Sequence, residues 1–136
     1  RRLLRVVALE PPGATIPGIS QAILVEGGQP LYLSGHVPFD AEGAVVGADH
    51  ATQLDQVFRN IADTLRTAGV GFESVARLTI YVRDFDSSLL PQIREVRDRW
   101  VNTACPPASA LVGVASLFRP EVLVEVDAFA IVPAAK

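Results

Sequence analysis

Hydrophobic and polar positions follow two different periods along this chain. Residues 74–83 alternate strictly between apolar and polar side chains, which predicts a β-strand with one buried face. Between residues 50 and 68, apolar side chains recur three and four positions apart, which predicts an amphipathic helix capped by Asp49 and ended by Gly69. The same spacing from Ser87 or Ser88 onward predicts a second helix.

Short runs rich in β-branched residues predict the remaining strands, which are residues 3–9, 21–26, 31–37, 108–115 and 122–132. The segments 21–26 and 31–37 are expected to form a hairpin around Gly27-Gly28-Gln29-Pro30. This order of elements predicts one α+β domain over residues 1–136. In this predicted domain, two helices cover one face of a mixed sheet. The opposite face carries leucine, tyrosine and threonine, so we expect it to be covered by oligomerisation.

The last predicted strand carries two acids in an apolar setting. Residues 122–132 are almost wholly apolar, which is typical of a strand buried on both faces. Because strand side chains alternate, Glu125 and Asp127 point to the same side, about 6.5–7 Å apart. Two carboxylates on such a strand must be solvated, paired or used in chemistry.

Composition narrows the class of protein. Hydrophobic residues make up 49% and charged residues 20% of the chain, as in a globular domain, and the net charge of −3 argues against nucleic acid as a partner. No apolar run reaches the ~18–20 residues that span a membrane. The single cysteine, Cys105, excludes an internal disulfide and suits the cytoplasm. His36, His50 and Cys105 lack metal-ligand spacing, and no cofactor motif is present, so we expect neither metal nor cofactor.

Several ordered blocks resemble the signatures of the RidA/YjgF family of reactive-intermediate deaminases. The matching blocks are LYLSGHVP (31–38), the helix with Gln53, Val57, Asn60 and Ile61 before Ala68-Gly69, LTIYVRD (78–84), PA (107–108) with VGVA (112–115), and VEVDA (124–128). The resemblance extends from about Ser20 to Ile131. It implies a chorismate-mutase-like α+β fold, a homotrimer that packs through the helix-free face, and small-molecule sites in the clefts between subunits.

The resemblance also implies a chemistry. Proteins of this family hydrolyse enamines and imines to a keto acid and ammonia. An arginine holds the substrate carboxylate by a bidentate pair, and a glutamate on the last strand handles the water. Carried onto this chain, the glutamate is Glu125. The implied substrate-binding positions are Ser109, Ala110, Leu111, Ser34, Gly35, Ile19 and Tyr81.

Three of these positions depart from the family pattern. The clamp arginine falls on Ser109, a frequent cysteine falls on Leu111, and an aromatic residue near the start falls on Ile19. Ser109 cannot supply a charge-assisted bond worth about 1.5–3 kcal/mol. Another cation replaces the arginine, or the ligand lacks a carboxylate there, or the site no longer catalyses. The candidate cations are Arg77, Arg83 and Arg119.

Two functions of different classes therefore remain open. The first is a hydrolytic deaminase of small imines or enamines with an atypical substrate, which the retained Glu125 favours. The second is a non-catalytic trimeric module that binds a small ligand or a partner protein, which Ser109 favours. In the second, Glu125 is an interface acid paired with an arginine of the neighbouring subunit. Ribonuclease activity, also attached to this family, ranks last because the chain is acidic and lacks a basic and aromatic patch.

Overall fold

The computed structural model describes residues 5–13 and 15–134 as an α+β fold. Residues 3 and 4 of the predicted first strand lie outside the described residues. The elements in chain order are β1 (Arg5–Leu9), β2 (Ala22–Glu26), β3 (Gln29–His36), α1 (His50–Thr67), the 3₁₀ turn η1 (Phe72–Ser74), β4 (Val75–Arg83), the 3₁₀ turn η2 (Ser87–Leu89), α2 (Leu90–Trp100), β5 (Ala108–Val114) and β6 (Val124–Val132).

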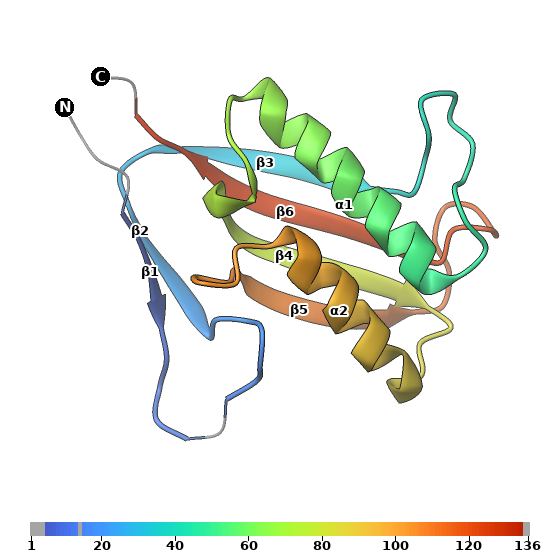
Figure 1. Cartoon of the computed structure of the whole chain (residues 1–136), viewed down its shortest axis with the longest axis horizontal. Helices are drawn as coiled ribbons and strands as arrows, with labels where there is room; N and C mark the ends of the chain where they lie inside the picture. The colour runs from blue at the N-terminus through green and yellow to red at the C-terminus, as the bar shows by residue number, and fades with distance from the viewer. Residues whose placement is uncertain (1–4, 14, 135–136) are drawn as a thin grey trace.

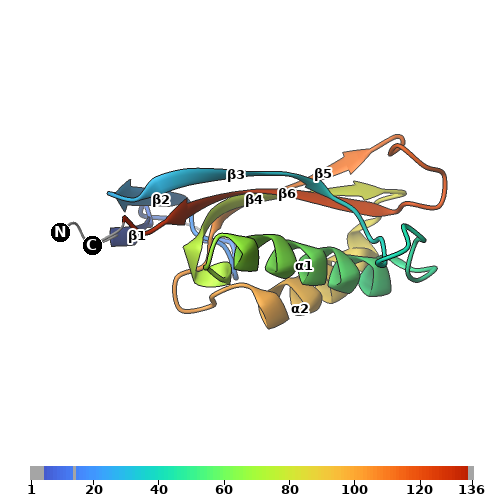
Figure 2. The same cartoon turned by 90° about the horizontal axis from the view of Figure 1, so that it is seen from above.

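Four strands form a mixed sheet in the order β3-β6-β4-β5. Strand β6 is antiparallel to both β3 and β4, whereas β4 and β5 are parallel. Both helices lie on one face of this sheet and leave the other face uncovered, as Figure 2 shows. The predicted arrangement of a mixed sheet with two helices on one face is therefore confirmed.

The hydrophobic core lies between this sheet and the helices. Phe58 and Ile61 of α1 and Ile93 of α2 are at most 1% exposed and pack in one cluster with Ile80 of β4 and Val126 of β6. Full burial of one such side chain stabilises the fold by about 1.5–3 kcal/mol. These contacts hold the sheet rigid, which is what a precisely placed site on its surface requires.

The boundaries of α1 follow its capping residues. The side chain of Asp49 accepts a hydrogen bond of 2.9 Å from the backbone N–H of Thr52, which satisfies one of the free donors of the first turn. Gly69 follows the C-cap with a φ of +75°, a conformation that glycine adopts without strain. Both ends of this helix were predicted from the sequence, and both are confirmed.

A buried glutamine of α1 holds the segment that enters β6. The side-chain amide of Gln53, 1% exposed, donates to the carbonyls of Gly47 (3.1 Å) and Glu121 (2.9 Å), and its oxygen accepts from the backbone N–H of Leu123 (2.8 Å). Leu123 lies two residues before Glu125. The glutamine therefore positions the start of the strand that carries the candidate acid.

The sequence predicted that β6 is buried on both faces, but the structure buries only one of them. Val124, Val126 and Ala130 point toward the helices and are fully buried, while Glu125 and Asp127 on the other face are only half-buried. The reason is that the helices cover only one side of the sheet. On the uncovered side, which we call the helix-free face, Tyr32 of β3 is 76% exposed.

The hairpin predicted for residues 21–37 does not form. Strand β2 pairs with β1, and β3 pairs with β6. Ser20, two residues before β2, forms a parallel bridge with Ala108 of β5, at the opposite edge of the sheet from β3. Strand β2 must therefore cross the end of the sheet rather than lie beside β3 (Figure 1). Five extended residues cover about 17 Å, which is enough to span three interstrand spacings of about 4.8 Å each.

Candidate functional site

Side chains of β4 and β6 form a polar cluster on the helix-free face. The register pairs Tyr81 with Glu125 and Thr79 with Asp127, so these four side chains share that face. The Tyr81 hydroxyl donates a hydrogen bond of 3.0 Å to Asp127 Oδ2. This bond, together with burial and the charges of Asp127 and Glu125, raises the pKa of Tyr81. The phenol therefore stays protonated at neutral pH and keeps Asp127 in place.

Glu125 is the carboxylate of this cluster that is suited to proton transfer. Burial raises the pKa of Glu125, and the negative charge of Asp127 raises it further. A carboxylate whose pKa moves toward the working pH is a better general base than an ordinary one. The partner of Asp127 is Tyr81, so the two acids of β6 have different environments.

A glycine of β3 lies directly against this carboxylate. A Cβ placed on Gly35 would lie 2.0 Å from Glu125 Oε2 and 2.8 Å from its Cδ. Only glycine leaves room for the carboxylate in this position. Glu125, Asp127, Tyr81 and Gly35 are called the Glu125 group below.

A β-bulge at Ser34 and Gly35 interrupts the regular pairing of β3 with β6. The register between β3 and β6 shifts between Leu33 and His36, and Ser34 is exposed at this shift. Nδ1 of His36 donates to the Ser34 carbonyl at 2.7 Å, and Nε2 lies 2.7 Å from the Thr64 hydroxyl of α1. His36 therefore joins the bulge to the helix layer, and Ser34 is not among the residues that line the cavity described next.

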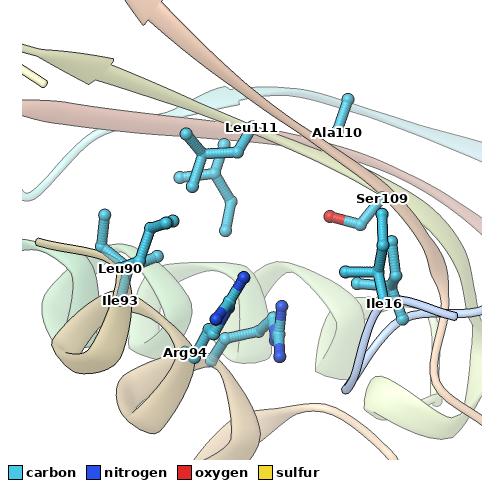
Figure 3. A pocket seen from close by; sticks show the side chains of 10 residues that line it. Ile16, Leu90, Ile93, Arg94, Ser109, Ala110 and Leu111 are labelled. Atoms are coloured by element: carbon cyan, nitrogen blue, oxygen red, sulfur yellow. The ribbon is translucent and has the colours of Figure 1, made fainter. Parts of the chain in front are cut away.

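A cavity of about 340 Å³ lies on the other side of the sheet, between β5 and α2 (Figure 3). Ser109 and Leu111 pair with Leu78 and Ile80, whose side chains face the helices, so they face the same way. Figure 3 shows the Ser109 hydroxyl directed into this cavity and the Ala110 methyl group on the opposite side of β5. We call this cavity the β5 pocket.

The loop before β2 closes one side of the β5 pocket. The Ser20 hydroxyl donates to the Pro106 carbonyl at 2.6 Å, and the Ser20 N–H donates to the Pro107 carbonyl at 3.1 Å. These bonds place Ile16 and Ile19 in the pocket wall. The crossing of β2 over the end of the sheet thus brings Ile19 beside Ser109, which lies about 90 residues later in the chain.

Apart from Ser34, the sequence-predicted site residues fall into two groups on opposite faces of the sheet. Glu125, Gly35 and Tyr81 lie together on the helix-free face, and Ile19 and the 109–111 segment line the β5 pocket. Within one chain the sheet separates the two groups. The structure brings each group together but does not join them.

The cations named from the sequence do not line the β5 pocket. Arg83 pairs with Asp84 at 3.5 Å, Arg119 stacks over the Phe39 ring at 4.8 Å, and Arg77 is exposed on the helix-free face. The pocket is instead lined by Arg94 and Arg97 of α2, which the sequence analysis missed. Their spacing with Leu90 and Ile93 places all four on one face of the helix, and this signal could have identified them.

Residues 5–13 and 15–134 show neither a cluster of metal ligands nor a helix suited to a membrane. No group of three or more histidine, cysteine, aspartate or glutamate residues in that part of the chain could hold a metal ion. None of its helices combines the length and the apolar character that crossing a membrane requires.

Comparisons with known proteins cover both groups of candidate residues. The sequence model of a family described as endoribonuclease L-PSP matches residues 13–132. The chain is 36% identical over 113 residues to Protein DfrA of Myxococcus xanthus, covering 82% of this chain and 83% of that protein. It is 30% identical over 121 residues to human 2-iminobutanoate/2-iminopropanoate deaminase, covering 88% of this chain and 83% of the human protein.

Solved structures share the fold over nearly its whole length. A protein of unknown function of the conserved Rid protein family, YyfB from Yersinia pestis, matches with a TM-score of 0.87 and 31% identity, covering 93% of this chain and 98% of that one. RidA from an Antarctic Psychrobacter matches with a TM-score of 0.69 and 28% identity, covering 92% of this chain and 94% of that one.

Proposed function

Because this chain belongs to the endoribonuclease L-PSP family, which includes the Rid proteins, we propose that it is a hydrolytic deaminase of small imines and enamines. The human relative named as a 2-iminobutanoate/2-iminopropanoate deaminase supports this reaction class. The observation that carries the proposal is Glu125, a half-buried carboxylate with a raised pKa. Ser109 stands at the clamp position of the family, so the chain is an atypical member that lacks the arginine there.

In the proposed reaction, Glu125 takes a proton from water as the water oxygen forms a bond to the imine carbon. The C=N electron pair moves to nitrogen, which takes this proton back from Glu125, and a neutral carbinolamine results. Glu125 then accepts the proton of the carbinolamine hydroxyl as the carbonyl forms and delivers a proton to the amine nitrogen, so the C–N bond breaks, ammonia leaves and Glu125 is again a carboxylate. An enamine enters the same route after protonation at its β-carbon. General base catalysis of this kind contributes about 10²–10⁴-fold.

The complete site requires a second copy of the chain. Glu125 and the β5 pocket lie on opposite faces of one sheet, so they act on one substrate only when Glu125 of one subunit faces the pocket of the next. Tyr32 at 76% exposed and Phe129 beside it at 4.9 Å between ring centroids give the helix-free face an apolar surface for that contact. A homotrimer with clefts between subunits satisfies both requirements.

Ammonia release from imines generated in situ by an amino-acid oxidase tests this function. Glu125→Gln is expected to lower turnover by about 10²–10⁴-fold, because the amide cannot accept the proton from water. Glu42→Gln, which removes an exposed loop carboxylate, is the matched control and should keep full turnover. The proposal fails if Glu125→Gln releases ammonia as fast as Glu42→Gln.

The alternative is a non-catalytic trimeric module that binds a small ligand or a partner protein, and the neutral Ser109 favours it. In that case no imine in the panel is hydrolysed faster than in buffer, and Glu125→Gln alters oligomer stability instead. An RNA substrate is disfavoured, because a chain with a net charge of −3 repels phosphates.

A further inference from the structure

Helix α2 presents two guanidinium groups to the β5 pocket. Leu90, Ile93, Arg94 and Arg97 follow helical spacing and all line the cavity. The facing walls are apolar, with Ile16, Ile19, Ile80 and Leu111 among them. Figure 3 shows Arg94 on α2 across the cavity from Ser109. Arg97 is buried and Arg94 is exposed, so Arg94 is the cation of this pair that a ligand entering from solvent can reach.

Arg97 is held in place by the loop that precedes β2. It is 7% exposed, its Nε donates to Asp98 Oδ1 at 2.9 Å, and its Nη2 donates to the Pro17 carbonyl at 3.4 Å. Gly18, at a φ of +83°, makes room for it, since a Cβ there would lie 1.9 Å from that nitrogen. A guanidinium has five N–H donors, and these two bonds use only part of them.

Arg94 is the cation that lacks a protein partner. Among the described residues it forms no hydrogen bond or ion pair, although its neighbours Arg97 and Arg99 both do. Arg94 and Arg97 bring two positive charges to the pocket, and Asp98 neutralises one of them. One positive charge remains, which matches a single monoanionic group.

We infer that Arg94, supported by Arg97, replaces the clamp arginine missing at Ser109 and binds the carboxylate of an α-imino acid with an aliphatic side chain. The carboxylate lies against α2, with the Ser109 hydroxyl as a further donor across the cavity. The isoleucine and leucine side chains of the wall exclude water from the aliphatic part of the ligand. The cation has moved from the strand to the facing helix, so a carboxylate substrate remains compatible with Ser109. This substrate class rests on the proposed deaminase function.

Binding of the α-keto acid of leucine, the expected product type, tests the clamp without depending on turnover. By titration calorimetry on the full chain, Arg94→Gln should weaken this binding by about 10- to 100-fold, the contribution of a charge-assisted hydrogen bond. Arg94→Lys, which keeps the charge but loses the planar fork, should give an intermediate affinity. Arg99→Gln, on the same helix but outside the pocket, is the matched control and should bind as the wild type does.

The corresponding amide of the keto acid separates charge recognition from apolar packing. It should bind weakly to the wild type and equally weakly to Arg94→Gln. The inference is overturned if the keto acid binds Arg94→Gln as tightly as Arg99→Gln, or if the wild type shows no saturable binding.

The two proposals fail separately. Glu125→Gln should retain keto acid affinity that depends on Arg94, even where turnover is lost. Arg94-dependent binding without any imine hydrolysis would leave the clamp standing and refute the deaminase. Glu125-dependent hydrolysis with unchanged kinetics in Arg94→Gln would leave the deaminase standing and refute the clamp.

Discussion

Gly35 offers a direct test of the position of Glu125. A methyl group at Gly35 would lie 2.0 Å from Glu125 Oε2, whereas ordinary contact begins near 3.4 Å. In Gly35→Ala the carboxylate must therefore withdraw by about 1.4 Å, the difference between these two distances. The φ of Gly35 is not in the left-handed region, so alanine causes no backbone strain there.

The expected loss is in the chemical step. A misplacement of about 1 Å costs on the order of 10²-fold in rate, which corresponds to about 2.7 kcal/mol of transition-state stabilisation. Because the obstructing atoms are the end of a flexible, half-buried side chain, the fold absorbs the methyl group with a stability change below about 1 kcal/mol. The kcat for imine hydrolysis should fall while KM and the melting temperature stay near their wild-type values.

Steady-state ammonia release with the best imine of the panel measures both constants, and thermal denaturation measures the fold. Gly113→Ala is the matched control, because the nearest atom to its added methyl group would be Cβ of Phe85 at 3.4 Å, an ordinary contact. That variant should keep kcat within about twofold. A wild-type kcat in Gly35→Ala would refute the assignment of Glu125 as the group that activates water.

Three further perturbations test the surroundings of the site. Glu125→Gln should raise the melting temperature at pH 7, because the raised pKa of Glu125 means that its ionisation costs stability as pH rises from the ordinary glutamate value through the raised one. Gln53→Ala should lower the free energy of unfolding in urea by about 2–4 kcal/mol, because three hydrogen bonds are lost and the Leu123 N–H is left unpaired. Asp49→Ala should cost about 1 kcal/mol in thermal denaturation through loss of the α1 cap.

Each of these predictions has a distinct contradicting result. The stabilisation by Glu125→Gln should vanish well below about pH 4, where glutamate is protonated in both states. A lower melting temperature at pH 7 would instead indicate that an arginine of a neighbouring subunit pairs with Glu125. Gln56 of α1 is only half-buried, so Gln56→Ala should cost less, and an equal cost would refute the special role of Gln53. Asp49→Asn should keep most of the stability that Asp49→Ala loses, because asparagine also caps a helix. An equal loss in both variants would contradict the capping role.

The elements that the sequence predicted well are those whose signals are local. The alternation in residues 74–83 and the spacing in residues 50–68 depend only on which side of the element faces the core. Asp49 and Gly69 act on their own helix ends. The order of the elements along the chain was sufficient to predict the layers, because two amphipathic helices and a sheet must share one core.

The placement of β2 could not be predicted from local signals of this kind. Gly27-Gly28 is a local hairpin signal, and both glycines do have positive φ values of +84° and +76°. The bonds of Ser20 to Pro106 and Pro107, which hold β2 across the end of the sheet, join segments more than 80 residues apart. The periodicity of a short stretch of sequence cannot predict a contact between segments so far apart.

The sequence by itself determined the α+β layers, the shared face of Glu125 and Asp127, and the absence of an arginine at Ser109. Only the tertiary structure decided that Glu125 and Ser109 lie on opposite sides of the sheet and that Arg94 lies in the cavity beside Ser109. The physical reason is that alternation assigns a side chain to a face of its own strand, whereas a cavity depends on which strand and helix the chain brings together. In this fold the packing of α2 on β5 and the crossing of β2 make that decision.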